Sequence, residues 1–427
     1  MQTIKVVDAR MGRGKSTAAI RFINQHKKTR KFMYVTPFLT EVARFRRECG
    51  LEEPTEDDEH SKLACLRQLL YQGKSISTTH SLYQLIDDDM LDIIRDGKYT
   101  LIVDETLTAI EKPAITFPDK CILDTITTVD DTGLVTWNDA GYEGKFSGYK
   151  DMADRRTLYD IDHTMIHTFN TNLFTAFEDV YLLTYLFKGS MLEAYMNCFD
   201  LPYEIWGIGT DDTVSVPGAP CTGGGSVLIP GADVPPPLDF RPLLSIVDKK
   251  AMNAVGEQHY ALAKNWYERR SYHNEEIIQL RKNMHNFFKN ITKSNKDNRL
   301  WTCFKDHADK LIPDNGSYAK NFLQMQARAT NDFARCSNLA YMANRFEDPN
   351  MMKFFHMRGC DIDQDLCALS DMLQWIWRSS IRNNRPIQLY LPSRRMRDIL
   401  TDWLDRTADG APVECMAECQ ETNQTEL

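Results

Sequence analysis

A short segment near the N-terminus combines glycines, a lysine and two hydroxyl side chains in a spacing suited to holding phosphate. It runs Asp8-Ala9-Arg10-Met11-Gly12-Arg13-Gly14-Lys15-Ser16-Thr17, and Ala9 stands where this pattern usually has its first glycine. Glycines let backbone N–H groups turn inward toward phosphate oxygens, and a helix N-terminus adds positive potential. Lys15 would reach the β- and γ-phosphates of a nucleoside triphosphate, and Ser16 would hold Mg²⁺. We therefore predict a phosphate-binding loop over residues 9–17.

Two carboxylates follow a second apolar run, Tyr99-Thr100-Leu101-Ile102-Val103-Asp104-Glu105. At the tip of a strand, Asp104 would bind Mg²⁺ through water, and Glu105 would orient and deprotonate the water that attacks the γ-phosphate. We expect this strand to neighbour the strand that precedes the phosphate-binding loop. Together the two segments predict a site for hydrolysis of a nucleoside triphosphate.

A third segment carries cationic side chains that phosphoryl transfer can use. On a single helix, Gln374, Arg378 and Arg382 fall at i, i+4 and i+8 and so share one face. Phosphoryl transfer uses such cations to stabilise transition-state charge. The same spacing also fits a solvated helix face whose other side, with Trp375 and Ile376, lies in the core.

The elements that must position these residues alternate along the first half of the chain. Strands are predicted at 3–7, 31–36, 75–78, 99–103 and 180–184, and helices at 39–49, 61–70 and 81–95. Alternation of this kind indicates a mostly parallel sheet with helices on both faces. Residues 121–149 break the pattern, and Val129–Trp137 resembles a hairpin with its turn at Asp131–Gly133. We interpret this region as an antiparallel insertion.

Composition divides the chain further. Residues 207–241 hold a Gly-Gly-Gly-Ser run and a Pro-Pro-Pro run and are interpreted as a linker. This gives a first domain over 1–206, a second over 242–406 and a polar tail over 407–427. In the second domain we predict helices at 249–292, 338–346 and 368–382, and strands at 300–304 and 387–391. The predicted fold class is α/β.

Bulk properties narrow the function classes. The chain has 427 residues and a net charge of −9, which argues against a bulk electrostatic grip on nucleic acid but not against a local basic cleft. No apolar run approaches the length of about 18 residues that predicts a membrane span. Eleven scattered cysteines without a secretory signal are typical of reduced thiols. We expect a cytoplasmic protein, in the host cytoplasm if it is viral, with no membrane partner.

The motifs resemble those of superfamily 2 helicases of the DEAD-like type, in particular small replication helicases of bacteriophages. Asp8–Thr17 is similar to motif I and Asp104-Glu105 to the opening of motif II. The weaker matches, in chain order, are Tyr34–Glu41 (motif Ia), Ser77–His80 (Ib), Leu183–Ser190 (III), Trp301–Lys305 (IV) and Ala327–Asn331 (V). The last match, Gln374–Arg382 with motif VI, is as specific as the first two. The arginines of the last motif are four residues apart, whereas the family has them three apart.

The resemblance implies two RecA-like domains that use ATP and Mg²⁺ and bind nucleic acid through its backbone. Arg378 and Arg382 would then be arginine fingers, and Thr184 would couple hydrolysis to strand movement. The residues implied to face the strand are Thr36, Pro37, Thr78, Thr79, His80, Lys305, Thr330 and Asn331. The expected activity is an ATP-dependent helicase or translocase, on DNA rather than RNA, with replication proteins as candidate partners.

Two other functions fit the same sequence. Asp361, Asp363 and Asp365 alternate, which suits the two-metal site of a nuclease and hence a packaging-type ATPase. The same residues suit a turn and N-cap before a helix. The third possibility is a replication initiator that binds DNA and uses ATP as a switch without unwinding. Nicking of a plasmid would favour the nuclease, and tight sequence-selective binding would favour the initiator.

Overall fold

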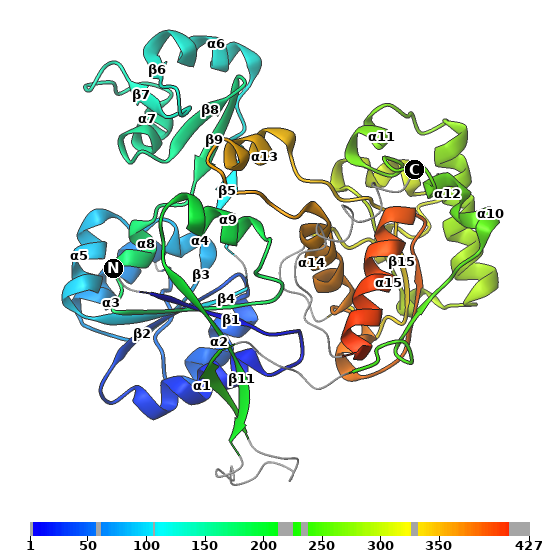
Figure 1. The fold of residues 1–427 in the computed structure, drawn as a ribbon, viewed down its shortest axis with the longest axis horizontal. Coiled ribbons are helices and arrows are strands. Elements are labelled where there is room, and N and C mark those ends of the chain that lie inside the picture. Colours follow the sequence, from blue (N-terminus) through cyan, green and yellow to red (C-terminus); the bar gives the residue numbers. More distant parts are fainter. Residues whose placement is uncertain are drawn as a thin grey trace, which may run out of the picture. The chain divides into compact units, whose positions relative to one another are not determined.

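The computed structural model describes residues 3–56, 61–105, 107–211, 225–231, 238–325 and 332–409. The chain divides into two compact units. The first comprises Met1–Asp233 together with Glu347–Ile362, and the second comprises Val234–Phe346 together with Asp363–Leu427. Each unit combines helices with a sheet whose strands are largely parallel (Figure 1). The predicted α/β class, with two parallel-sheet domains, is therefore confirmed.

The sheet of the first unit has seven described strands in the order β12-β11-β1-β10-β4-β2-β3. Neighbours are parallel except β11 and β12, which are antiparallel. Every residue of β4 is buried, as expected of a parallel strand covered on both faces. The strands are β1 (Ile4–Asp8), β2 (Lys31–Thr36), β3 (Ile76–Thr79), β4 (Tyr99–Asp104), β10 (Asp179–Thr184), β11 (Tyr203–Asp211) and β12 (Gly225–Pro230).

Helices connect these strands at positions close to those predicted. They are α1 (Lys15–His26), α2 (Leu39–Cys49), α3 (Lys62–Tyr71), α4 (His80–Tyr83), α5 (Asp88–Asp96), α8 (Asn172–Thr175) and α9 (Met191–Cys198). The single helix predicted over 81–95 is wrong, because Asp87 starts a new one. The Asp87 side chain accepts a hydrogen bond from the Met90 N–H. Asp88 and Asp89 lie in the first turn of α5, where their negative charges stabilise the positive end of the helix dipole.

The insertion after β4 is larger than predicted and has a core of its own. It holds β5 (Ile110–Glu111), α6 (Phe117–Ile126), β6 (Thr127–Val129), β7 (Val135–Trp137), α7 (Ser147–Asp154), β8 (Leu158–Ile161) and β9 (Thr164–Thr168). The predicted hairpin is confirmed as the antiparallel pair β6 and β7. Its inner face packs with the hydrophobic cluster of Leu123, Val135, Trp137, Phe146, Ala153, Leu158 and Met165.

A segment from the second half of the chain belongs to the first unit. It contains α13 (Pro349–His356) and lies against the insertion. Lys353 Nζ lies 2.5 Å from Asp162, and Asn350 donates a 2.7 Å hydrogen bond to Thr164. The Arg358 guanidinium lies 3.7 Å from the ring centre of Phe354. Residues on both sides of Glu347–Ile362 belong to the second unit, so this segment ties the insertion to that part of the chain.

The linker predicted over 207–241 is wrong in its first part. β11 and β12 are strands of the first sheet and are paired from Trp206–Pro230 to Asp211–Gly225. Glycine has a packing role here, because a Cβ on Gly209 would lie 2.9 Å from the Ile229 side chain. Gly209 therefore allows close packing of the two strands. The boundary between the units falls at Asp233 and Val234.

The second unit has a parallel sheet in the order β13-β16-β15-β14. Its strands are β13 (Leu244–Ile246), β14 (Arg299–Thr302), β15 (Asn338–Tyr341) and β16 (Ile387–Tyr390). Its helices are α10 (Lys250–Asn253), α11 (Lys264–Glu268), α12 (Glu275–Asn286), α14 (Gln364–Ile376) and α15 (Arg394–Asp409). The helix predicted over 338–346 is wrong. Residues 338–341 form a fully buried central strand. A short apolar run in the sequence does not distinguish a buried strand from a helix.

Candidate active site

The predicted phosphate-binding loop connects β1 to α1, as the sequence indicated. Gly12 and Gly14 have φ of +82° and +85°, which only glycine adopts at little cost. Ala9 is buried, does not have positive φ, and donates its N–H to the Thr184 carbonyl at 3.1 Å. The substitution of alanine for the usual first glycine is therefore compatible with this loop.

Lys15 is the first residue of α1, and its side chain folds back over the loop. Its Nζ donates to the carbonyl of Ala9 and lies 3.5 Å from the carbonyl of Arg10. These contacts hold the ammonium group over the loop that precedes the helix N-terminus. Both the lysine charge and the helix N-terminus favour an anion at this position.

The strand order corrects one expectation. β1 and β4 are not neighbours, because β10 lies between them. Asp8 pairs in register with Thr184, and Leu183 pairs with Asp104, so the carboxyl ends of the three strands lie side by side. The loop after β10 is also attached to β1, since the Phe187 N–H donates to the Asp8 carboxylate at 3.0 Å. Thr184 is thus placed between the two acidic strand ends, and its coupling role stays a prediction.

Three side chains converge on Asp104, which is 6 % exposed. The Ser16 hydroxyl and the Tyr34 phenol each lie 2.8 Å from its Oδ2 atom. His80 Nε2 lies 3.1 Å from its backbone carbonyl. The hydroxyl of Ser16 and the carboxylate of Asp104 are the hard oxygen ligands that Mg²⁺ prefers, and they already lie together. These two residues therefore fit the predicted metal site.

Tyr34 was not among the predicted site residues. Burial and the nearby Asp104 charge raise its pKa well above the usual value for tyrosine, so the phenol stays protonated and donates. Its ring stacks on Phe45, with 3.4 Å between ring centres. This contact arises because β2, which carries Tyr34, pairs with β4.

Glu105 follows Asp104 directly and has an unusual backbone conformation. Its φ is +67°, in the left-handed region that costs a residue with a side chain about 1–3 kcal/mol. Its N–H donates to the Leu183 carbonyl at 3.1 Å. The chain therefore turns sharply after β4, beside the end of β10. Strained residues of this kind cluster at functional sites, which agrees with the predicted role of Glu105 in activating water.

The residues predicted to face nucleic acid occupy several environments. Thr36 and Thr78 are buried, and Thr79 caps α4 by accepting the Leu82 N–H. His80 is buried against Asp104, as described above, so it belongs to the interior of the site rather than to its surface.

Thr36 and Thr79 pair in register, which brings the ends of β2 and β3 together. Pro37 is partly exposed, and Lys305 is exposed after β14. Thr330 and Asn331 lie outside the described residues. The nucleic-acid role of this set stays a prediction.

The shared helix face predicted for Gln374, Arg378 and Arg382 is wrong. Helix α14 ends at Ile376, Arg378 lies in a turn, and Arg382 lies in a short 3₁₀ turn. Ser379 causes part of this ending, because its hydroxyl donates to the Ile376 carbonyl at 2.6 Å. The next N–H, of Ser380, donates to the carbonyl of Cys336 and directs the chain toward β15. The roles of all three residues stay predictions.

The alternating aspartates do not form a metal cluster. Asp363 caps α14 by accepting the N–H groups of Asp365 and Leu366. Asp365 forms a 2.6 Å ion pair with Arg395, and Asp361 lies 2.9 Å from His356. In the described ranges, no group of three His, Cys, Asp or Glu side chains could hold a metal ion.

The hairpin of β11 and β12 lies against the phosphate-binding loop. A Cβ on Gly14 would lie 2.5 Å from the Ser226 hydroxyl. Arg13 donates to the Ile208 carbonyl at 3.2 Å, and Arg21 donates to the Gly225 carbonyl at 3.0 Å. Sequence reasoning missed this contact, because the hairpin was assigned to the linker.

With this geometry established, relatives of the chain place it in a family. It is 34% identical over 422 residues to the SPbeta prophage-derived protein YonV of Bacillus subtilis (strain 168), covering 95% of this chain and 99% of that protein. The chain belongs to the YonV family. Residues 239–404 match the family of the YonV C-terminal Rossmann-like domain. This range contains the four strands of the parallel sheet of the second unit.

Solved structures with a similar arrangement include helicases. An apo XPD structure has a TM-score of 0.49 and 11% identity over 93% of this chain and 95% of its own. S. tokodaii Xpd4 has the same score and identity over 94% of both chains. A DUF1998 helicase, MrfA bound to DNA, has a score of 0.35 and 10% identity, over 97% of this chain and half of its own. At these scores the site residues, not the neighbours, carry the functional argument. The narrower resemblance to bacteriophage replication helicases gains no support from these structures.

Across the described residues, no helix is both long and apolar enough to cross a bilayer.

Proposed function

We propose that this YonV protein is a P-loop ATPase stimulated by nucleic acid, and that it acts as a helicase or translocase on DNA. The observation that carries the proposal is the convergence of Lys15, Ser16, Asp104 and Glu105 at the carboxyl ends of β1 and β4. Open α/β sheets bind ligands at this edge. The order of the weaker motifs supports nucleic acid as the stimulating partner.

Each residue of this set has a role in hydrolysis. The Lys15 ammonium group binds the β- and γ-phosphates, replacing its present contacts with the loop carbonyls. Ser16 and Asp104 hold Mg²⁺, which supplies neutralisation of phosphate charge when it is bound. Glu105 orients the attacking water and accepts its proton. Tyr34 positions Asp104 through a contact with its carboxylate, and His80 does so through a contact with its backbone carbonyl.

The alternatives differ in their support. The capping role of Asp363 and the ion pair of Asp365 speak against a nuclease site. An ATP-switched initiator would use the same nucleotide site as a motor, and a measurement of strand unwinding distinguishes the two functions. The prophage origin of the relative supports a role in phage DNA replication, which we include in the proposal.

The test is ATP hydrolysis at low salt with no nucleic acid, single-stranded DNA, duplex DNA or RNA. Lys15→Ala is the blank, and Lys28→Ala, an exposed lysine just after α1, is the matched charge control. We expect stimulation by DNA, a loss of about 100-fold or more in Lys15→Ala, and no change in Lys28→Ala.

Three results would contradict parts of the proposal. Hydrolysis that is independent of nucleic acid would favour a switch or a motor driven by a protein partner. Stimulation by RNA alone would overturn the DNA assignment. An absence of hydrolysis under every condition would overturn the ATPase.

A further inference from the structure

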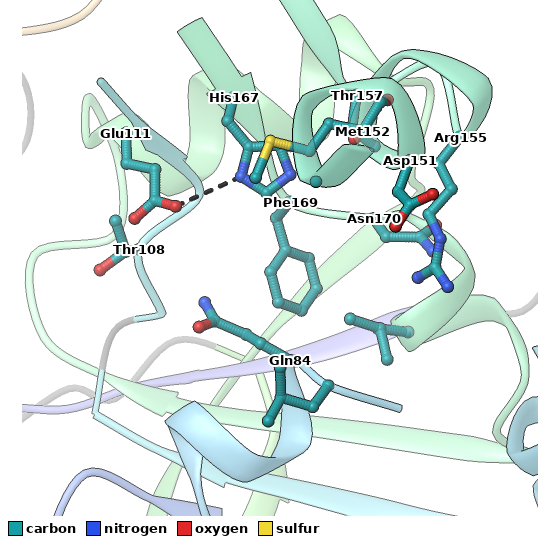
Figure 2. A pocket seen from close by; sticks show the side chains of 13 residues that line it. Gln84, Thr108, Glu111, Asp151, Met152, Arg155, Thr157, His167, Phe169 and Asn170 are labelled. Carbon is teal, nitrogen blue, oxygen red and sulfur yellow. Dashed lines mark hydrogen bonds and ion pairs between the residues drawn. The ribbon is translucent and has the colours of Figure 1, made fainter. Parts of the chain in front are cut away.

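A pocket of about 380 Å³ lies between the insertion and the parallel-sheet part of the first unit. It is lined by Gln84 and Leu85 after α4, by Thr108 after β4, by α7, and by β9 with the residues after it. Figure 2 shows the Gln84 amide beside the Phe169 ring, with Glu111 on one side and Asp151, Arg155 and Asn170 on the other. No role in the proposed ATP site uses this pocket.

Several polar groups of the pocket have no protein partner. The side chains of Gln84, Thr108, Asp151 and Arg155 form no hydrogen bond or ion pair with another residue in the described part of the chain. They are exposed and are available to a ligand. His167, by contrast, lies 3.3 Å from Glu111. A ligand could therefore form hydrogen bonds with these four side chains without breaking any hydrogen bond within the protein.

The apolar part of the pocket suits a flat ring. Phe169, Met152 and Leu173 line it together with Leu85; Phe169 is 5 % exposed and Leu85 is 58 % exposed. The Phe169 ring is held in place by the rings of Phe174 and Tyr195. Binding pockets for small groups commonly combine such apolar walls with a few polar groups that fix orientation.

The charges of the pocket exclude a phosphate as its occupant. Two carboxylates, Glu111 and Asp151, face one guanidinium, Arg155, and a histidine already engaged with Glu111. An anion would meet no net positive charge there, whereas phosphate sites gather cations or helix N-termini. A neutral planar group with several hydrogen-bonding edges fits both the charge and the apolar wall. Nucleobases have these properties, and they stack on aromatic side chains and pair with amides.

The position of the pocket connects it to the ATP site. Gln84 follows α4, and α4 begins at His80, whose ring contacts the Asp104 carbonyl. Thr108 lies four residues beyond Asp104 on the same chain segment. We propose that the pocket between Gln84 and Phe169 holds one unpaired base of a bound single strand. This inference rests on the proposed function. It specifies the substrate as a single strand in which one base is turned away from its neighbours.

The test uses single strands in which one position at a time lacks its base. Gly148→Leu adds a bulky side chain at the pocket wall, where nothing lies within 4 Å of a Cβ and leucine suits a helix better than glycine. Gln84→Ala removes the amide. Gln72→Ala, an exposed glutamine outside the pocket lining, is the matched control. Affinity is measured by fluorescence anisotropy, and a 2-aminopurine at the sensitive position reports its stacking.

We expect one position of the strand at which loss of the base weakens binding to wild type and Gln72→Ala by about 10-fold or more. In Gly148→Leu and Gln84→Ala, loss of the base at this position should no longer weaken binding. Both variants should still bind longer strands more tightly than shorter ones, because phosphate contacts are unchanged. Equal affinity for all the abasic strands, or an unchanged dependence in Gly148→Leu, would overturn the base pocket and leave the ATPase proposal intact. Absence of any strand binding would overturn both the pocket and the helicase.

Discussion

The phenol of Tyr34 and the hydroxyl of Ser16 donate to the same oxygen of Asp104, each at 2.8 Å. Two neutral donors thus hold one carboxylate oxygen from the strand on one side and from the phosphate-binding helix on the other. Because the phenol cannot ionise near neutral pH, it remains a donor whatever the nucleotide state. Tyr34 therefore acts as a positioning residue for the predicted metal ligand.

We expect Tyr34→Phe to lower the free energy of unfolding by about 1–2 kcal/mol, because a buried carboxylate loses one of its hydrogen bonds. It should also raise the Mg²⁺ concentration needed for half-maximal ATP hydrolysis. Tyr99→Phe is the control, since Tyr99 donates a 2.8 Å hydrogen bond to the Lys74 carbonyl, away from Asp104. Urea unfolding should be affected in both variants, and Mg²⁺ dependence only in Tyr34→Phe. An unchanged Mg²⁺ dependence in Tyr34→Phe would refute the positioning role.

Buried tyrosines predict a loss of stability in alkali. Burial raises the pKa of Tyr99 and of Tyr181 to about 12, and it also raises the pKa of Tyr34 well above the usual value for tyrosine. An unfolded tyrosine ionises near pH 10, so the unfolded chain releases these protons first. The stability they contribute is complete below about pH 10 and is lost as the pH rises toward 12.

The measurement for this prediction is urea unfolding at pH 8, 9.5 and 11, with phenolate absorbance followed in parallel. Tyr99→Phe should show a shallower decline between pH 9.5 and 11, because it lacks one of the shifted groups. Stability that stays level over this range, or complete phenolate formation in the folded protein near pH 10, would contradict the prediction.

The parts of the site that the sequence predicts are those contained in one continuous segment. Ala9–Thr17 and Asp104-Glu105 each combine a strand, a turn and reactive side chains within a few residues, and local chemistry determines their form. Tyr34 and Asp104 are 70 residues apart, and their contact depends on which strands pair. Strand order is a long-range property that hydrophobic periodicity does not encode.

The errors have similar physical causes. Residues 338–341 form a strand where a helix was predicted, and residues 207–211 belong to a strand where a linker was predicted. A short buried run, or nearby runs of glycine and proline, carries no information about which strands will pair. The helix face through Arg378 failed because a hydroxyl, on Ser379, satisfies a helix carbonyl and ends the helix early. Strand pairing overrode the local pattern in the first two cases, and a local side-chain hydrogen bond did so in the third.

Gly14 and Gly12 allow the hairpin contact to be tested by a matched pair. Both have positive φ, but a Cβ on Gly14 meets Ser226, whereas nothing lies within 4 Å of one on Gly12. Gly12→Ala should therefore cost only the backbone strain of about 1–2 kcal/mol, and Gly14→Ala should cost more. Adding Ser226→Gly should remove the excess in Gly14→Ala and leave the strain. Equal costs for the two alanine variants in thermal unfolding would show that the hairpin does not lie on the loop.

Arg358 should contribute more than Lys353 to holding Glu347–Ile362 on the first unit. Its guanidinium lies 3.7 Å from the Phe354 ring centre and 4.8 Å from that of Tyr159, and it donates a 2.8 Å hydrogen bond to the Thr132 carbonyl. Burial lowers the pKa of Arg358, as expected of a partly desolvated cation. Lys353 pairs with Asp162 in an exposed position, where ion pairs contribute about 0.2–1 kcal/mol.

Hydrogen exchange of the α13 amides measures the difference directly, because local opening exposes them. Arg358→Ala loses two ring contacts and the guanidinium hydrogen bonds to the carbonyls of Phe354 and Thr132, worth about 2 kcal/mol together. Exchange in α13 should then accelerate by roughly 30-fold, and in Lys353→Ala by no more than about 5-fold. Similar acceleration in the two variants would mean that the ion pair to Asp162 anchors the segment. Because the residues on both sides of this segment belong to the second unit, its release should also lower nucleic-acid-stimulated hydrolysis more than basal hydrolysis.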